Sequence, residues 1–242
     1  MKIYKRIKAF YFWIFFIFSV ALVLFAFCFT KNQNMLWKIR KLWAKTQKYT
    51  IGYRIELVGE FNPEASMLVI NHQSTLDIIA LEELFPKNLA WIAKKELAEI
   101  PLFKIAMKKP KFLCIDRKNP RDLVRILKEA KQRLEEDRVL AIFPEGTRSR
   151  TEKLLKFQNG AKILADKLKL KVQPILIIDS AKILDTKNFT ASSGILKIIC
   201  MNLIDTNDEK WLENTRKNMQ ELLDKERILS ENLNIEMENK EC

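Results

Sequence analysis

The sequence predicts an α/β domain with a mixed, largely parallel sheet flanked by helices, preceded by an N-terminal membrane helix and an interfacial amphipathic helix. Two observations support this prediction. From Ile51 onward, short apolar runs alternate with segments of helical periodicity, which is typical of domains built around parallel strands. Ahead of Ile51, a long uncharged apolar stretch is followed by a basic, tryptophan-containing one.

The first element is the apolar segment 9–29, which contains no charged residue. As a helix it would extend about 31 Å, roughly the thickness of the hydrocarbon layer of a bilayer. A secretory signal peptide is the alternative, but the small residues of a cleavage site are missing, so the segment predicts a retained anchor. Lys and Arg flank it on both sides, so spanning the bilayer and dipping into one leaflet both stay open.

The second element is an amphipathic helix over residues 33–49, with basic side chains on the face opposite its apolar one. This pattern predicts a helix that lies at the membrane surface, and a helix packed on the domain is the alternative. The apolar face would carry Leu36, Ile39, Leu42, Trp43 and Thr46, and the remainder Lys38, Arg40, Lys41, Lys45 and Lys48.

The body of the chain predicts one α/β unit followed by a polar helix, which divides the protein into an anchor (1–50), a domain (51–229) and a frayed polar tail (230–242). The predicted strands are 53–58, 67–70, 89–93, 112–115, 139–143, 172–178 and 195–203, and the predicted helices are 74–84, 120–136, 160–168 and 208–229.

The charge is concentrated at the N-terminus and favours a membrane partner over nucleic acid. The net charge is +13, and residues 1–50 contribute ten Lys/Arg and no Asp or Glu. Because these basic residues flank an apolar stretch, an anionic lipid surface fits them better than a nucleic acid does. One histidine and four cysteines without paired spacing make a metal site improbable, and reduced cysteines suit a cytosolic face.

The strongest chemical signal is the segment from Asn71 to Asp77, which contains the single histidine of the chain, His72. It follows the apolar run 67–70, and Ser74 with Asp77 forms a capping pair that would open a helix. Asp77 is then near enough to hold one imidazole nitrogen, which gives a base and its carboxylate without a protein nucleophile. The missing nucleophile would be a hydroxyl of the substrate. A histidine satisfied by hydrogen bonds at a turn is the plain alternative.

A second segment, from Phe143 to Arg150, also follows a predicted strand. In open α/β sheets, ligands bind beyond the carboxyl ends of the strands. Gly146 would let backbone approach a ligand, and the guanidinium of Arg148 matches two oxygens of a phosphate. A solvated charged turn is the alternative. Arg117 stands at the end of a third strand.

Together these motifs resemble the glycerolipid acyltransferase family, and within it the bacterial 1-acyl-sn-glycerol-3-phosphate (lysophosphatidate) acyltransferases. The resemblance covers roughly residues 51–205 and is carried by Asn-His, four residues, and Asp, followed later by Phe-Pro-Glu-Gly-Thr-Arg-Ser-Arg. Family-like marks also occur at Ala93–Leu97, Ile115–Arg117 and 172–175. The sequence departs from the family at Lys111, where a glycine is common, and at Gln158, where a lysine is common.

The resemblance implies the family fold and the transfer of an acyl group from acyl-CoA or acyl carrier protein to the sn-2 hydroxyl of 1-acyl-sn-glycerol 3-phosphate, giving phosphatidate. It implies no metal or cofactor, contact with membrane lipids, and a catalytic domain on the cytoplasmic face of a bacterial inner membrane. Alternatives are another lysolipid or glycerol 3-phosphate as acceptor, a serine hydrolase using Ser74, and a non-catalytic protein bound to anionic lipid. The implied roles are base for His72, its orienting carboxylate for Asp77, a group near the reacting carbonyl for Lys94, and phosphate binding for Glu145, Gly146, Thr147, Arg148 and Arg117.

Overall fold

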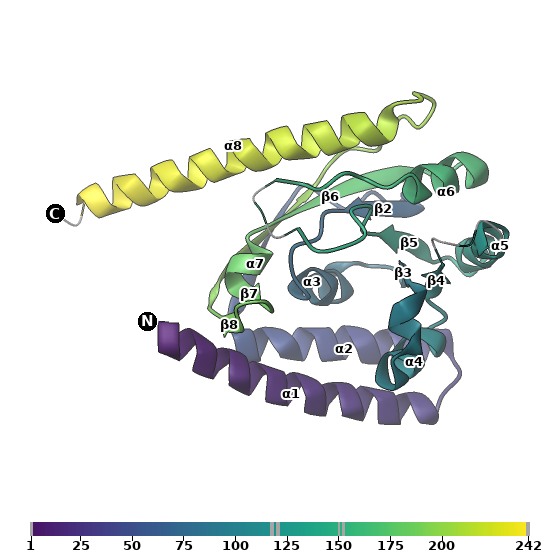
Figure 1. The fold of residues 1–242 in the computed structure, drawn as a ribbon, viewed down its shortest axis with the longest axis horizontal. Coiled ribbons are helices and arrows are strands. Elements are labelled where there is room, and N and C mark those ends of the chain that lie inside the picture. The colour runs from purple at the N-terminus through teal and green to yellow at the C-terminus, as the bar shows by residue number, and fades with distance from the viewer. Residues whose placement is uncertain (1, 117–118, 120–121, 150, 152, 241–242) are drawn as a thin grey trace.

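The computed structural model describes residues 2–116, 119, 122–149, 151 and 153–240 of the chain, and Figure 1 shows its arrangement in layers. A twisted sheet lies in the middle, with helices on both faces. The helices are α1 (Lys2–Cys28), α2 (Gln33–Ile51), α3 (Leu76–Leu84), α4 (Pro101–Lys108), α5 (Asp122–Glu135), α6 (Gly160–Leu168), α7 (Ser180–Ile183) and α8 (Trp211–Lys240), with a 3-10 turn η1 (Lys95–Glu99).

Seven strands form the main sheet in the order β1-β9-β6-β2-β5-β3-β4. All neighbouring strands are parallel except β6 and β9, so β1 and β9 run against the other five. The strands are β1 (Tyr53–Val58), β2 (Met67–Ile70), β3 (Leu89–Lys94), β4 (Leu113–Ile115), β5 (Val139–Ile142), β6 (Val172–Ile178) and β9 (Gly194–Cys200), and β7 (Leu184–Asp185) pairs with β8 (Thr190–Ala191) in a separate hairpin. The mixed, largely parallel sheet is as predicted.

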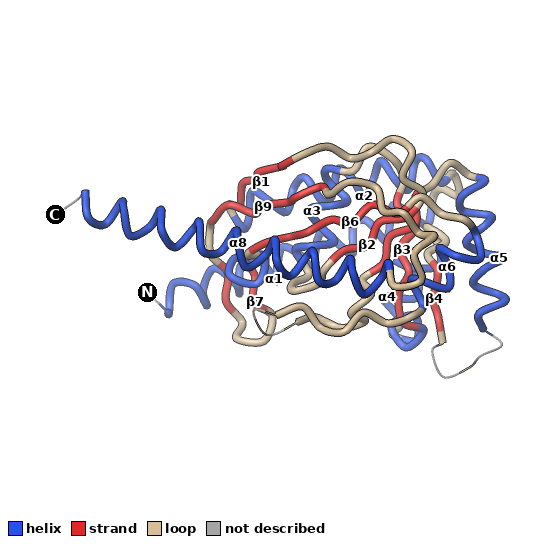
Figure 2. Tube along the Cα trace, turned by 90° about the horizontal axis from the view of Figure 1, so that it is seen from above, coloured by secondary structure: helices blue, strands red, loops and turns tan. Residues whose placement is uncertain are grey.

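The central strands are buried on both faces, which explains why they are continuous apolar runs in the sequence. In β2, Leu68 and Ile70 belong to the core shared with α1, α2 and α3, whereas Met67 and Val69 belong to the core shared with α5, α6 and α8. Figure 2 shows the strands side by side beneath α8. Adjacent β2 and β5 are in register, with Val69 opposite Ile142, so the two segments that follow these strands emerge together at one edge.

Helix α2 packs on the domain, and its buried face differs from the predicted apolar face at two positions, while its place at a membrane surface stays a prediction. Leu42 is 66% exposed, whereas Arg40 is only 6% exposed. Arg40 can be buried because Glu82 pairs with it (Nε to Oε2, 3.4 Å) and Asn88 accepts a hydrogen bond from it at 2.7 Å. Helix α2 therefore covers the sheet through α3 and is an integral layer of the domain.

Helix α1 lies along α2 and leaves much of its apolar surface exposed. In the described part of the chain it is the one helix long and apolar enough to cross a membrane (Ile3–Cys28, mean hydropathy 2.5). Trp43 of α2 donates a hydrogen bond to Ser19 at 3.0 Å, and Lys8 donates one to Ser193 beside β8 at 2.6 Å. The exposed residues are mostly large and apolar, among them Ile7, Phe10, Ile14, Ile17, Phe18, Leu22 and Phe25.

The structure differs from the sequence prediction in several short elements and at the C-terminus. Helix α8 continues to Lys240, past its predicted end at 229 and through the tail expected to be frayed; a run of Glu, Leu, Asn and Lys without Gly or Pro is compatible with this continuation. The elements η1, α4, α7, β7 and β8 were not predicted, because segments this short carry too little periodicity.

Candidate active site

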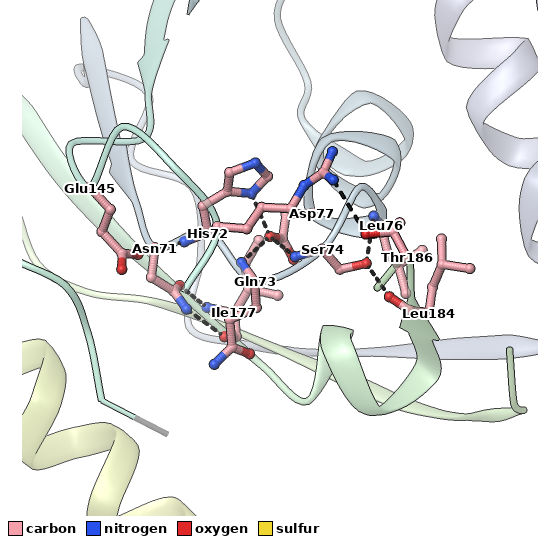
Figure 3. A network of polar contacts seen from close by, with 11 residues as sticks. Asn71, His72, Gln73, Ser74, Leu76, Asp77, Glu145, Ile177, Leu184 and Thr186 are labelled. Atoms are coloured by element: carbon pink, nitrogen blue, oxygen red, sulfur yellow. Dashed lines mark hydrogen bonds and ion pairs between the residues drawn. The ribbon is translucent and has the colours of Figure 1, made fainter. Parts of the chain in front are cut away.

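The site lies at the edge of the sheet where β2 and β5 end. Asn71, the first residue after β2, makes two hydrogen bonds with the backbone of Ile177 in β6. Its Nδ2 donates to the carbonyl of Ile177 at 2.8 Å, and its Oδ1 accepts the N–H of Ile177 at 2.7 Å. This amide pair replaces the ladder hydrogen bonds where β2 leaves the sheet, and it fixes the point from which the next residue, His72, projects (Figure 3).

His72 and Asp77 lie in contact, as the predicted roles of base and orienting carboxylate require. The Nδ1 atom of His72 lies 2.8 Å from Oδ2 of Asp77, and the same oxygen accepts the backbone N–H groups of Gln73 (2.7 Å) and Ser74 (2.9 Å). Asp77 is fully buried, whereas the His72 side chain is 12% exposed. Because the carboxylate oxygen accepts, Nδ1 donates, and Nε2 is left with the lone pair that can take a proton from a substrate.

The imidazole ring is also held from its face. Phe143, the first residue after β5, stacks on it with ring centroids 3.9 Å apart and an angle of 16° between the planes. Phe143 in turn stacks with Trp91 of β3, with ring centroids 5.3 Å apart. The Nε1–H of Trp91 donates a hydrogen bond to the buried Glu82 at 2.7 Å. The ring of His72 therefore has one orientation, set by a hydrogen bond in its plane and a stack on its face.

Ser74 is a structural residue at the start of α3. Its hydroxyl donates to the carbonyl of Leu184 at 2.6 Å and accepts the N–H of Leu76 at 3.2 Å, and the side chain is buried. The helix begins at Leu76, two residues after the predicted start. A serine hydroxyl has a single proton, and Leu184 receives it, so Ser74 is not arranged as a nucleophile activated by His72.

Glu145 has a different place from the one that the resemblance implied. It is turned inward, 4% exposed, and its two oxygens accept the backbone N–H groups of His72 and Leu155, each at 2.8 Å. Burial raises the pKa of Glu145 to about 7, against the effect of these two hydrogen bonds, which favour the carboxylate. In this structure both oxygens of Glu145 are therefore used by backbone groups, one of them the N–H of His72.

The neighbouring residues Gly146, Thr147 and Arg148 form a short, more open loop, called here the 146–148 loop. Gly146 has φ of 72°, a conformation that glycine adopts without strain, and Thr147 is exposed. A guanidinium nitrogen of Arg148 lies 3.4 Å from Oγ1 of Thr186, in the β7–β8 hairpin. Sequence reasoning missed Thr186, because a hairpin with two-residue strands leaves no readable pattern.

The structure shows no contact between Lys94 and the base. Lys94 ends β3 at the same edge of the sheet, but its side chain is exposed and makes no hydrogen bond or ion pair with the described residues. Its neighbour Lys95 pairs with Asp116 (3.5 Å). Arg117 lies outside the described residues.

The arrangement can carry out one kind of step, the removal of a proton from a bound hydroxyl. Nε2 of His72 could take the proton, Asp77 would stabilise the imidazolium that forms, and the hydroxyl of Ser74 is bonded to Leu184 instead of to the imidazole. The adjacent loop contributes a cationic side chain at a glycine turn, which suits an anionic substrate.

Comparison with known proteins agrees with this geometry. The model of the Acyltransferase family matches residues 54–178. A 1-acyl-sn-glycerol-3-phosphate acyltransferase of Helicobacter pylori is 41% identical over 172 residues, covering 70% of this chain and 73% of that protein. The corresponding alpha enzyme of mouse is 34% identical over 169 residues, covering 68% of this chain and 59% of that protein.

The fold is shared with a solved structure. The crystal structure of the 1-acyl-sn-glycerophosphate acyltransferase from Thermotoga maritima superposes with a TM-score of 0.71 at 22% identity, covering 93% of this chain and 96% of that one. The family match and the identity to the Helicobacter pylori protein lead to one conclusion. The chain is an acyltransferase and belongs to the Acyltransferase family.

Proposed function

We propose that this acyltransferase transfers a fatty acyl group from a thioester carrier, acyl-CoA or acyl carrier protein, to the sn-2 hydroxyl of 1-acyl-sn-glycerol 3-phosphate, forming phosphatidate for phospholipid synthesis. The observation that carries the proposal is the 2.8 Å contact between His72 and Asp77 in a site where the hydroxyls of Ser74 and Ser149 both donate to backbone carbonyls. The names of the relatives support lysophosphatidate as the acceptor.

In the proposed reaction, Nε2 of His72 removes the proton of the acceptor hydroxyl as the oxygen attacks the thioester carbonyl. A carbon–oxygen bond forms and the carbon–sulfur bond breaks, and the imidazolium returns its proton to the leaving thiolate. Such a base contributes about 10²–10⁴-fold, so orientation and stabilisation of the oxyanion must supply the rest. The chemistry requires no metal or cofactor beyond the acyl donor. Lys94 stays a proposed group near the thioester carbonyl.

The proposed phosphate site is the 146–148 loop. The guanidinium of Arg148 offers two parallel donors, and backbone at Gly146 can approach a ligand because no Cβ intervenes. Arg117 remains a proposed second arginine. Glycerol 3-phosphate or another lysolipid as acceptor would use the same loop, so an acceptor series separates these alternatives.

We further propose that α1 lies in one leaflet of the membrane and does not cross it. Contacts hold α1 to the domain near both ends, since Phe12 belongs to the core with β8 and Phe27 packs with Leu36 of α2. A helix flush with the domain exposes only one side to lipid. The catalytic domain would lie on the cytoplasmic face of the membrane, where its cysteines stay reduced.

The orientation of α1 can be tested without any substitution. With protein bound to the outside of sealed anionic vesicles, a membrane-impermeant amine reagent should modify both Lys5 and Lys31, which lie at opposite ends of the apolar stretch. Protection of one of these lysines with modification of the other would mean that the helix spans the bilayer.

The reaction is tested with purified protein, lysophosphatidate and either acyl donor. Phosphatidate should form with at least one of the two thioesters. Formation of free fatty acid without an acylated acceptor would instead indicate a hydrolase, and turnover of glycerol 3-phosphate in preference to lysophosphatidate would replace the acceptor.

A further inference from the structure

The backbone and ring of His72 are held by the segment from Phe143 to Ser149 at three points. The ring of Phe143 stacks on the imidazole at 3.9 Å. Glu145 accepts the N–H of His72 at 2.8 Å, and the N–H of Ser149 donates to the carbonyl of His72 at 2.7 Å. Only the in-plane hydrogen bond to Asp77 comes from the histidine's own segment.

The 146–148 loop lies between two of these three points. Glu145 precedes it and Ser149 follows it, and both residues are buried. Ser149 is fixed in turn, because its hydroxyl donates to the carbonyl of Lys153 at 2.8 Å. A ligand that moves or tightens this three-residue loop therefore acts directly on the two residues that bracket the backbone of the base.

We propose that Glu145 is a positioning residue that couples occupation of the 146–148 loop by the acceptor's phosphate to the placement of His72. This inference rests on the proposed function and deepens it. The phosphate group then does more than hold the acceptor in the site. It helps to set the base, so an acceptor without a phosphate is turned over more slowly even when it saturates the enzyme.

The chemistry of Glu145 explains why a carboxylate is needed. Both oxygens accept from backbone N–H groups, of His72 on one side and Leu155 on the other. A glutamine has one accepting oxygen and one donating nitrogen, so it would set a donor against one of the two N–H groups. Glu145→Gln keeps the shape and size of the side chain and breaks one of the two hydrogen bonds.

The test compares two acceptors, lysophosphatidate and the matching 1-monoacylglycerol, which lacks the phosphate. Saturation curves give kcat and KM for wild type, Glu145→Gln, Arg148→Ala and the double variant. In wild type, kcat should be at least about tenfold higher with lysophosphatidate, since a charge-assisted hydrogen bond is typically worth a factor of this size. In Glu145→Gln, kcat with lysophosphatidate should fall to near the value with monoacylglycerol.

The double variant separates coupling from a general loss of structure. If both residues act through one loop, Arg148→Ala should lower kcat in the wild-type background and lower it little further in the Glu145→Gln background. The matched control is Gln173→Ala at the opposite end of β6, where a buried side chain also bonds backbone groups, those of Asn62, Glu60 and Met201. It should lower thermal stability and leave the ratio of the two kcat values unchanged.

Several outcomes would overturn the proposal. Equal kcat values for the two acceptors in wild type would do so without any variant, and so would multiplicative losses in the double variant. If Glu145→Gln does not accumulate as folded protein, Glu145→Asp, which keeps both oxygens on a shorter arm, takes its place in the same comparison. Absence of lysophosphatidate turnover in wild type would instead contradict the proposed function.

Discussion

The two strand-end segments that form the site differ in how completely they are held. In the base segment (residues 71–77), Asn71, Ser74 and Asp77 are buried, and their side chains bond to backbone groups. In the 146–148 loop, Thr147 is exposed and Arg148 is half-buried with a long 3.4 Å contact to Thr186. The tautomer of His72 is therefore set by Asp77 before substrate arrives, whereas the proposed phosphate contacts, and the coupling to His72 through Glu145, are completed by the substrate.

This difference has a physical reason. A base must have one tautomer and one direction at the moment of proton transfer, and water competing for its partners would spoil both. A phosphate is a large, symmetric anion that exchanges water for protein donors as it enters, so an accessible loop serves it better. Changes to the base segment should therefore reduce kcat with every acceptor, and changes to the loop should reduce only the use of acceptors that carry a phosphate.

The largest effect should come from His72→Ala. Since the chain has no second histidine, no side chain can replace the base, and turnover of lysophosphatidate should fall to background. Membrane binding should stay near wild type, and the melting temperature should fall only slightly, because Asp77 keeps its two backbone hydrogen bonds and the loss is confined to one hydrogen bond and the stack on Phe143. Phosphatidate formation by purified variant at a wild-type rate would contradict the role of His72.

Asp77→Asn should rank second. Oδ2 of Asp77 accepts from His72 and from the N–H groups of Gln73 and Ser74. An asparagine that presents its nitrogen there opposes all three donors and favours the wrong imidazole tautomer, and one that presents its oxygen there buries an NH2 group at the Oδ1 position and offers no negative charge to the imidazolium. We expect kcat to fall by about 10²–10⁴-fold. Measurement of kcat and the acceptor's KM separately checks this, because a loss confined to KM would place Asp77 in substrate binding.

Glu145, at the junction of the two segments, should give the protein a pH-dependent stability. Its pKa of about 7 lies above the ordinary value of 4.5, so the folded state holds the proton more tightly than the unfolded state does. The resulting stability is fully present below about pH 4.5 and is lost as pH rises toward 7, a change of about 3 kcal/mol.

Chemical denaturation across this pH range, for wild type and Glu145→Gln, measures the effect. The stability of wild type relative to the variant should decrease as pH rises from 4.5 to 7. Parallel stability curves for the two proteins would show that Glu145 ionises normally, as an exposed carboxylate does.

Much of the fold and the base could be predicted from sequence, because the relevant interactions are local or periodic. His72 and Asp77 are five residues apart, and the apolar runs of β2, β5 and β6 carry their burial in their composition. The inward orientation of Glu145 could not be predicted, since its partner His72 is 73 residues away. The burial of Arg40 likewise depends on Asn88, 48 residues away.

Arg148→Ala tests the other side of the comparison and should have a smaller effect. Charge-assisted hydrogen bonds to a phosphate contribute about 1.5–3 kcal/mol each, so kcat/KM for lysophosphatidate should fall roughly tenfold to a hundredfold. Arg148→Lys should recover only part of the loss, because a point charge lacks the two-pronged geometry. The KM of the acyl donor should change little, and an equal rise for donor and acceptor would mean that the phosphate is held elsewhere.

The smallest effect should come from Ser74→Ala, which separates the structural role of one residue in the base segment from the chemical roles of His72 and Asp77. The hydroxyl caps the start of α3 by accepting the N–H of Leu76 and ties it to the β7–β8 hairpin through the carbonyl of Leu184. Its removal should cost about 1 kcal/mol of unfolding free energy, the usual value of such a cap. Catalysis should be largely retained, because Asp77 keeps its hydrogen bonds to His72 and to the backbone of Gln73 and Ser74.

Thermal melts and kcat values measured on the same preparation test both expectations, and mass spectrometry of protein quenched during turnover tests whether Ser74 carries an acyl group. An acyl group found on Ser74 of the wild-type protein would show that this serine is a nucleophile and not a structural residue, and the protein would then react through an acyl-serine intermediate.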